Sequence, residues 1–151
     1  MKSKKMIVLM GLVLMLASVA AGCAPLGQVL GQDDGVSDDA LAGTAWLLVD
    51  MYGEAVPDGP QATLVLKEDQ ANGIAFCNSY FGDITRDGDE IAFGPLVQTE
   101  KFCMEPEGVM DLERNFLQAL SVTASYRVED EMLALLDGEG RTLLVLAPKA
   151  R

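Results

Sequence analysis

The sequence predicts a mainly β domain of the α+β type: a small antiparallel β-barrel or strongly curled sheet of about eight strands, with one helix packed against it. Short apolar runs separated by turn residues continue from Leu41 onward, which is typical of antiparallel strands. Several of the separating segments are acidic and contain Asp-Gly steps, as hairpin loops do. A single segment, 106–120, instead carries apolar residues at helical spacing.

Residues 1–22 have the pattern of a bacterial export signal. Three lysines precede an uncharged apolar run, 6–21, that is shorter than the ~20 residues a membrane-spanning helix needs. The run ends in Ala-Gly-Cys23, which resembles the lipobox of bacterial lipoproteins. That resemblance implies that residues 1–22 are removed and that Cys23 carries acyl chains such as palmitate, which anchor the protein to a membrane. An ordinary secretory signal, with Cys23 incidental, is the alternative.

The stretch that follows is expected to be a flexible tether, so that 23–40 comprises the lipidated cysteine and an acidic spacer. It contains four aspartates and no aromatic or basic residue, and it cannot bury enough apolar surface to offset its conformational entropy. Calcium binding by these acids is an alternative. Their spacing lacks the pattern of an EF-hand loop, which favours a solvated linker.

The domain itself is expected over 41–148, with eight candidate strands. They are 46–49, 63–66, 73–76, 82–85, 91–93, 125–128, 132–136 and 142–147. The loops 86–89, 129–131 and 137–140 lie between them, and glycine in the Asp-Gly steps permits positive φ at low steric cost.

The helical segment runs from Pro106 to Leu120. Its apolar stripe comprises Val109, Leu112, Phe116 and Leu120, about one turn apart. Proline suits the first helical turn, and the acids at 105, 107 and 111 complement the positive end of the helix dipole. We expect the helix to lie on the sheet or to plug one end of the barrel.

Composition excludes several classes of function. The chain has 151 residues, enough for one domain, and no histidine, which excludes a Ser-His-Asp triad, a Cys-His dyad and His-ligated zinc. A net charge of −12 repels nucleic acid. The sequence contains no P-loop, dinucleotide fingerprint or Gly-x-Ser-x-Gly elbow. We expect no cofactor and no bound metal.

Two cysteines remain after Cys23. An even pair in an exported chain is ordinarily a disulfide, which predicts a Cys77–Cys103 bridge. Two buried free thiols are an alternative. A redox dithiol is a further alternative, although the sequence has no Cys-x-x-Cys motif and neither histidine nor lysine flanks Cys77.

The segment 73–82, Gly-Ile-Ala-Phe-Cys-Asn-Ser-Tyr-Phe-Gly, resembles the Gly-x-x-Gly-Cys-Asn-x-Tyr-x-Gly core of the META domain, the family of the heat-shock protein HslJ. Phe76 stands where the family usually has glycine, at a point where a tight bend is expected. Further landmarks follow in the family's order, and the resemblance spans about 41–148. The matching motif residues are Trp46, Cys77, Asn78, Tyr80, Gly82, Thr99, Cys103, Glu113 and Phe116. The closing hairpin matches at Leu133, Leu135, Asp137 and Gly140.

Four of these residues are candidates for a role beyond packing: Asn78, Tyr80, Thr99 and Glu113. Asn78 is expected to stabilise a turn through nearby backbone, and Tyr80 to bury its ring with the hydroxyl at the barrel rim. Glu113 lies one position from the apolar stripe and needs a partner if it is buried, for which Arg114 or Lys101 would serve.

The leading functional hypothesis is a monomeric, non-catalytic lipoprotein of the bacterial envelope that binds a partner, such as an envelope protein, or supports envelope integrity, and the resemblance implies a link to stress. A module that binds a small molecule or peptide at the barrel mouth is the second hypothesis, and a carboxylate-based enzyme is the third. Ala24 after the lipidated cysteine favours the periplasmic face of the outer membrane in a cell with two membranes. In a cell with one membrane, we expect the outer face of the cytoplasmic membrane.

Overall fold

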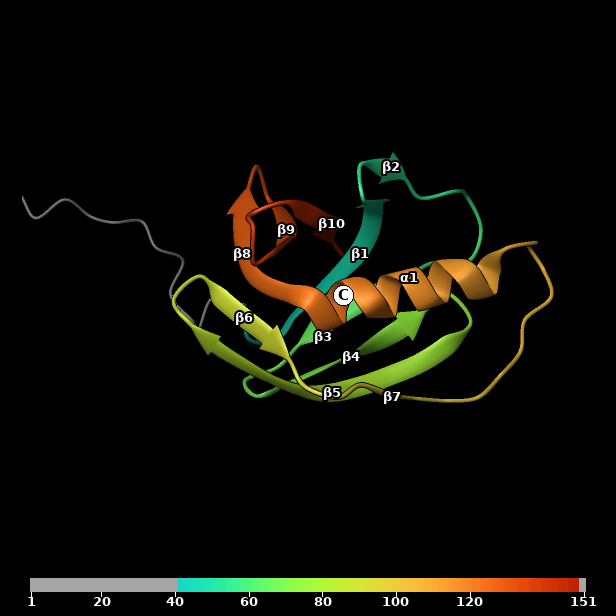
Figure 1. Ribbon diagram of the computed structural model, residues 1–151, viewed down its shortest axis with the longest axis horizontal. Coiled ribbons are helices and arrows are strands. Elements are labelled where there is room, and N and C mark those ends of the chain that lie inside the picture. Colours follow the sequence, from blue (N-terminus) through green and yellow to red (C-terminus); the bar gives the residue numbers. More distant parts are fainter. Residues whose placement is uncertain (1–40, 150–151) are drawn as a thin grey trace, which may run out of the picture. The chain divides into compact units, whose positions relative to one another are not determined.

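The computed structural model describes residues 41–149, and within them the chain forms ten strands and one helix (Figure 1). In chain order these are β1 (Thr44–Met51), β2 (Glu54–Ala55), β3 (Thr63–Leu66), β4 (Gln70–Ala75), β5 (Asn78–Asp87), β6 (Glu90–Phe93), β7 (Val97–Gln98), α1 (Val109–Val122), β8 (Thr123–Glu129), β9 (Met132–Asp137) and β10 (Thr142–Pro148). The predicted signal segment, Cys23 and the tether lie outside the described residues.

Eight of the strands close into an antiparallel barrel. Their order is β10-β9-β8-β6-β5-β4-β3-β1, and β1 pairs back onto β10 to complete the ring. The two-residue strands β2 and β7 pair with β1 and β5 respectively. The predicted mainly β barrel with one helix is therefore confirmed, and only the two short strands were not expected.

Alternation of side chains places the core inside the barrel. Along β5, buried and exposed residues alternate strictly from Asn78 to Thr85, because successive side chains of a strand point to opposite faces. Leucines from several strands, including Leu64, Leu133 and Leu144, are fully buried. Each such side chain stabilises the fold by about 1.5–3 kcal/mol relative to an exposed one. The interior is thus a packed core.

The helix α1 covers one opening of this barrel. It contacts β4, β6 and β10, which occupy different parts of the ring, and it crosses in front of the strands in Figure 1. Its buried residues are Val109, Glu113, Phe116, Ala119 and Leu120. Among residues 41–149, no helix is both long enough and apolar enough to span a membrane.

The start of α1 differs from the prediction. The helix begins at Val109, after a left-handed Gly108 with φ of 85°, and Pro106 lies in the preceding loop after a cis peptide bond. Of the three acids expected near the helix start, only Asp111 lies in the first turn. Leu112 is only half-buried, and Glu113 takes its place in the buried stripe.

Hairpin turns follow the expected chemistry at Gly88, where φ is 62°. In the β9–β10 loop the positive φ falls on Gly140 rather than on Gly138. The β8–β9 loop uses Asp130 and Glu131, with φ of 49° and 64°, and these positive values match a two-residue hairpin turn of the primed type.

Candidate functional site

Glu113 and Asn78 form the centre of a buried polar network at the helix-covered end of the barrel. Asn78 begins β5 and is 1% exposed, while Glu113 projects from α1 and is 3% exposed. The Glu113 carboxylate accepts hydrogen bonds from the Asn78 backbone N–H at 2.8 Å and from its side-chain amide at 2.9 Å. This contact differs from the expected partners of Glu113, since Arg114 pairs with Asp111 instead.

The other side of the Asn78 side chain holds the strap, which we define as residues 94–104 between β6 and α1. The Asn78 amide donates to the Lys101 carbonyl at 3.0 Å, and its oxygen accepts from the Lys101 N–H at 2.8 Å and the Thr99 hydroxyl at 2.7 Å. The amide thereby fills its two donor and two acceptor positions. Asn78 joins three segments distant in sequence, which differs from the expected role in a local turn.

A disulfide lies directly beside this network. Cys77 and Cys103 are bonded, with their Cα atoms 6.0 Å apart, and the bond ties the β4–β5 turn to the strap. The predicted pairing is therefore present. Since Asn78 follows Cys77 in sequence, the strap is fixed to the same point of the barrel by a covalent bond and by hydrogen bonds.

The turn before Cys77 has an unusual backbone. Phe76 adopts a φ of 60°, and the N–H of Cys77 donates to the carbonyl of Ala75 at 2.7 Å. A hydrogen bond between residues two apart, around a central residue of positive φ, defines a γ-turn, which is strained for a residue with a side chain. The Phe76 ring is nevertheless buried and meets the edge of Phe116, with ring centroids 6.3 Å apart. The tight bend expected here is present, with phenylalanine in a position suited to glycine.

Tyr80 lies deeper in the barrel than expected. Its hydroxyl donates to the Thr63 carbonyl at 2.8 Å, and its ring packs edge-on against Phe116 with centroids 5.7 Å apart. The side chain is 2% exposed, so the hydroxyl is buried and does not reach the rim. Burial raises the pKa of Tyr80 far above its ordinary value.

Gly82 allows the strap to cross β5 closely. A Cβ at this position would lie 2.8 Å from the Leu96 side chain and 3.0 Å from the Pro95 carbonyl oxygen. Trp46 has a local role, because its indole N–H donates to the Thr44 hydroxyl of the same strand at 2.7 Å. The remaining motif residues meet where the strap, β5 and α1 come together.

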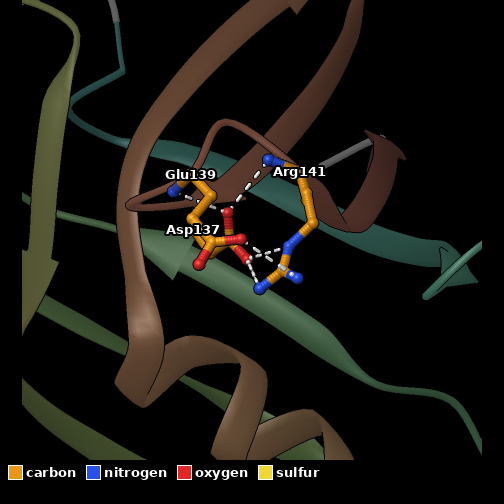
Figure 2. A network of polar contacts seen from close by, with 3 residues as sticks. All are labelled: Asp137, Glu139 and Arg141. Carbon is orange, nitrogen blue, oxygen red and sulfur yellow. Dashed lines mark hydrogen bonds and ion pairs between the residues drawn. The ribbon is translucent and has the colours of Figure 1, made fainter.

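A second polar network closes the β9–β10 hairpin (Figure 2). The Asp137 carboxylate accepts from the backbone N–H groups of Glu139 and Arg141, both at 2.9 Å, and from the Arg141 guanidinium at 2.7–2.8 Å. The backbone N–H and the guanidinium of Arg141 hold the pKa of Asp137 below its ordinary value. Asp137 in turn raises the pKa of Arg141. Residues 41–149 contain no group of three or more metal-ligating side chains.

A closed eight-stranded antiparallel barrel, covered by one helix and joined to it through a disulfide-linked strap, defines a class of small β-barrel domains. The chain belongs to the META domain family, whose model matches residues 39–150. No curated protein matches the sequence.

Solved structures share the fold. An NMR structure of a protein from Burkholderia xenovorans is 28% identical, with a TM-score of 0.61, over 76% of this chain and 87% of that one. A second NMR structure is 19% identical, with a TM-score of 0.59, over 74% of this chain and 94% of that one. A crystal structure of a DUF4847-family protein from Bacteroides vulgatus ATCC 8482 is 16% identical, with a TM-score of 0.58, over 76% and 98% of the two chains. The last two likenesses concern the fold alone.

Proposed function

We propose that this chain is a non-catalytic META-domain lipoprotein of the bacterial cell envelope, anchored through acyl chains on Cys23, that binds a partner and supports the envelope under stress. The anchor and the location follow from the pattern of residues 1–23, and the stress role follows from the resemblance to HslJ. In a cell with two membranes the proposed location is the periplasmic face of the outer membrane.

One observation carries the binding role. Phe102 and Met104 are 79% and 78% exposed, and they flank Cys103, whose disulfide fixes the strap to the barrel. These large apolar side chains are exposed to water on a segment that is already fixed in place. A partner that covers them gains the free energy of burying apolar surface, and exposed apolar side chains of this kind serve as anchors in protein interfaces. The strap therefore supports binding more directly than the barrel interior does.

The two buried carboxylates support the non-catalytic part of the proposal. Glu113 is engaged by Asn78, and Asp137 is engaged by Arg141 and by loop N–H groups. A glycosidase-type mechanism needs two carboxyl groups facing a substrate, with one free to donate a proton. The hypothesis of a ligand in the barrel mouth gains no support either, because Phe116 and Leu120 of α1 and Tyr80 of β5 fill that end.

Labelling and crosslinking in intact cells test this function. We expect radioactive palmitate to label the wild-type protein but not the Cys23→Ser variant. We also expect less of this variant than of the wild type in the membrane fraction. Crosslinking of the wild-type chain should recover the same envelope protein repeatedly. If the wild-type protein is not labelled, the proposed lipid anchor is wrong. If repeated crosslinking recovers no envelope protein, the proposed partner role is wrong.

A further inference from the structure

The face of α1 turned toward the strap carries a row of adjacent hollows. Three hollows, of about 520, 410 and 310 Å³, follow each other along this face. The first and second share Gln98 and Leu117, and the second and third share Phe102 and Met110. Because neighbouring hollows share wall residues, they lie next to one another along the helix, and we call this row of three hollows the groove.

Apolar side chains form part of the groove's walls, and the strap that carries some of them is fixed to the barrel. Leu117 and Met110 of α1 are half-buried in one wall, and Phe102 projects from the strap opposite. The strap is held at Lys101 by Asn78 and at Cys103 by the disulfide. A preformed groove avoids the ordering cost that a flexible segment would incur on binding.

An open strand edge borders the same groove. Among the described strands, β7 (Val97–Gln98) pairs only with β5, so its other edge has no strand partner. Gln98 of β7 lines both the first and the second hollow. An extended peptide can add to such an edge through main-chain hydrogen bonds while alternate side chains enter the hollows.

Charge indicates the chemistry of the occupant. Glu113 lines the middle hollow, and its carboxylate has hydrogen bonds but no ion pair within residues 41–149. Glu107 and Asp111 line the third hollow, and Arg114 in the wall is already paired with Asp111. A buried carboxylate without a cation is incompletely compensated, so a lysine or arginine entering the groove is favoured.

We propose that the groove between α1 and the strap binds an extended segment of a partner protein in which apolar residues are flanked by Lys or Arg. This inference rests on the proposed partner-binding function and adds its site and its chemistry. The chain's own tether does not suit the groove, because its four aspartates have the same sign as the lining acids. A second copy, at a net charge of −12, is repelled for the same reason.

Selection from random octapeptides displayed on phage, with the full-length chain in detergent as target, tests the inference. We expect the enriched sequences to combine apolar residues with Lys or Arg, and their affinity to fall as salt is raised. The variant Phe102→Ser, Met104→Ser should weaken the selected peptides at least about tenfold. Glu107 is exposed, and Glu107→Gln should weaken the binding of basic peptides more than that of neutral ones.

Tyr52→Ser is the matched control, because Tyr52 is 49% exposed in the turn between β1 and β2, two strands that contribute no residue to the three hollows. It should bind the peptides as the wild type does. The inference is overturned if no peptide is enriched, if the enriched peptides lack basic residues, or if Tyr52→Ser loses binding as much as the groove variant. Binding to phosphatidylcholine vesicles is measured in parallel. If the groove variant loses binding to these vesicles but not to the peptides, the surface binds lipid and the inference is overturned.

The same groove variant separates this inference from the proposed function. If crosslinking in cells still recovers the envelope partner with Phe102→Ser, Met104→Ser, the proposed function stands and the groove is the wrong site. If the wild-type chain recovers no partner in cells and enriches no peptide, both proposals fail.

Discussion

The Glu113 carboxylate on α1 accepts both the backbone N–H and the side-chain amide of Asn78, at 2.8 and 2.9 Å, across 35 positions of sequence. Both residues are buried, so water competes little for these hydrogen bonds. The pair connects the helix that covers the barrel to β5, whose first residue directly follows the disulfide-bonded Cys77.

Glu113→Gln should destabilise the domain by about 2–3 kcal/mol, because one acceptor oxygen becomes an NH₂ group that faces the donors of Asn78. Urea unfolding measures this change. Glu107→Gln is the matched control on an exposed residue and should change stability by less than about 0.5 kcal/mol. Equal stability of Glu113→Gln and the wild type would show that the pair does not hold α1 in place.

Replacing both Cys77 and Cys103 by alanine should lower the unfolding free energy by about 3–4 kcal/mol, because the bond closes a loop with a sequence separation of 26. In a Cys23→Ser background, a thiol reagent should label the native protein only after reduction. Immediate labelling of both cysteines would contradict the bridge.

At position 76, glycine should be more stable than alanine. Both substitutions remove the ring that packs on Phe116, but only glycine adopts a φ of 60° without steric strain. We expect Phe76→Ala to cost about 3 kcal/mol or more and Phe76→Gly about 1 kcal/mol less than that, as measured by denaturant unfolding. The reverse order would mean that the γ-turn is not strained.

Asp137 should make stability depend on pH in the acid range. The pKa of Asp137 is lowered in the folded protein, chiefly by hydrogen bonds from Arg141, so its contribution to stability is complete above the ordinary pKa of about 4. That contribution is lost as pH falls through the lowered value. The stability difference between wild type and Asp137→Asn should therefore be largest at neutral pH and shrink below about pH 4.

Unfolding curves recorded from neutral to strongly acid pH measure this difference. Glu107→Gln is the control, because Glu107 is exposed and takes part in none of the ion pairs within residues 41–149. A difference between wild type and Asp137→Asn that stays constant down to strongly acid pH would exclude this role.

Much of the barrel could be predicted from sequence because most of its eight main strands contain short apolar runs that turn residues separate. The strand 63–66 was predicted with its observed bounds, whereas β5 begins at Asn78 and not at Gly82. The start of β5 could not be predicted at Asn78 and Ser79, because polar residues such as these rarely indicate a strand. The two-residue strands β2 and β7 are too short to show any periodicity.

The centre of the site was harder to predict, because pairing across distant segments leaves no local pattern. The partner of Glu113 lies on β5, and neither residue is unusual for its own element. One signal was available: Glu113 is four positions after Val109 and three before Phe116, which places it inside the buried stripe of α1. The groove had no such signal beyond apolar Phe102 and Met104 in a loop.

Because β1 pairs with β10, the barrel can close only after β10 has been synthesised. Trp46 lies opposite Pro148, so one edge of β1 has no hydrogen-bonded strand until β10 pairs with it. Such pairing has high contact order and forms slowly, because a long intervening chain must first be brought together. Until then, the edges of β1 and β9 stay open to other chains. Loss of the last strand should therefore leave a chain prone to aggregate, in contrast to loss of the two-residue β2.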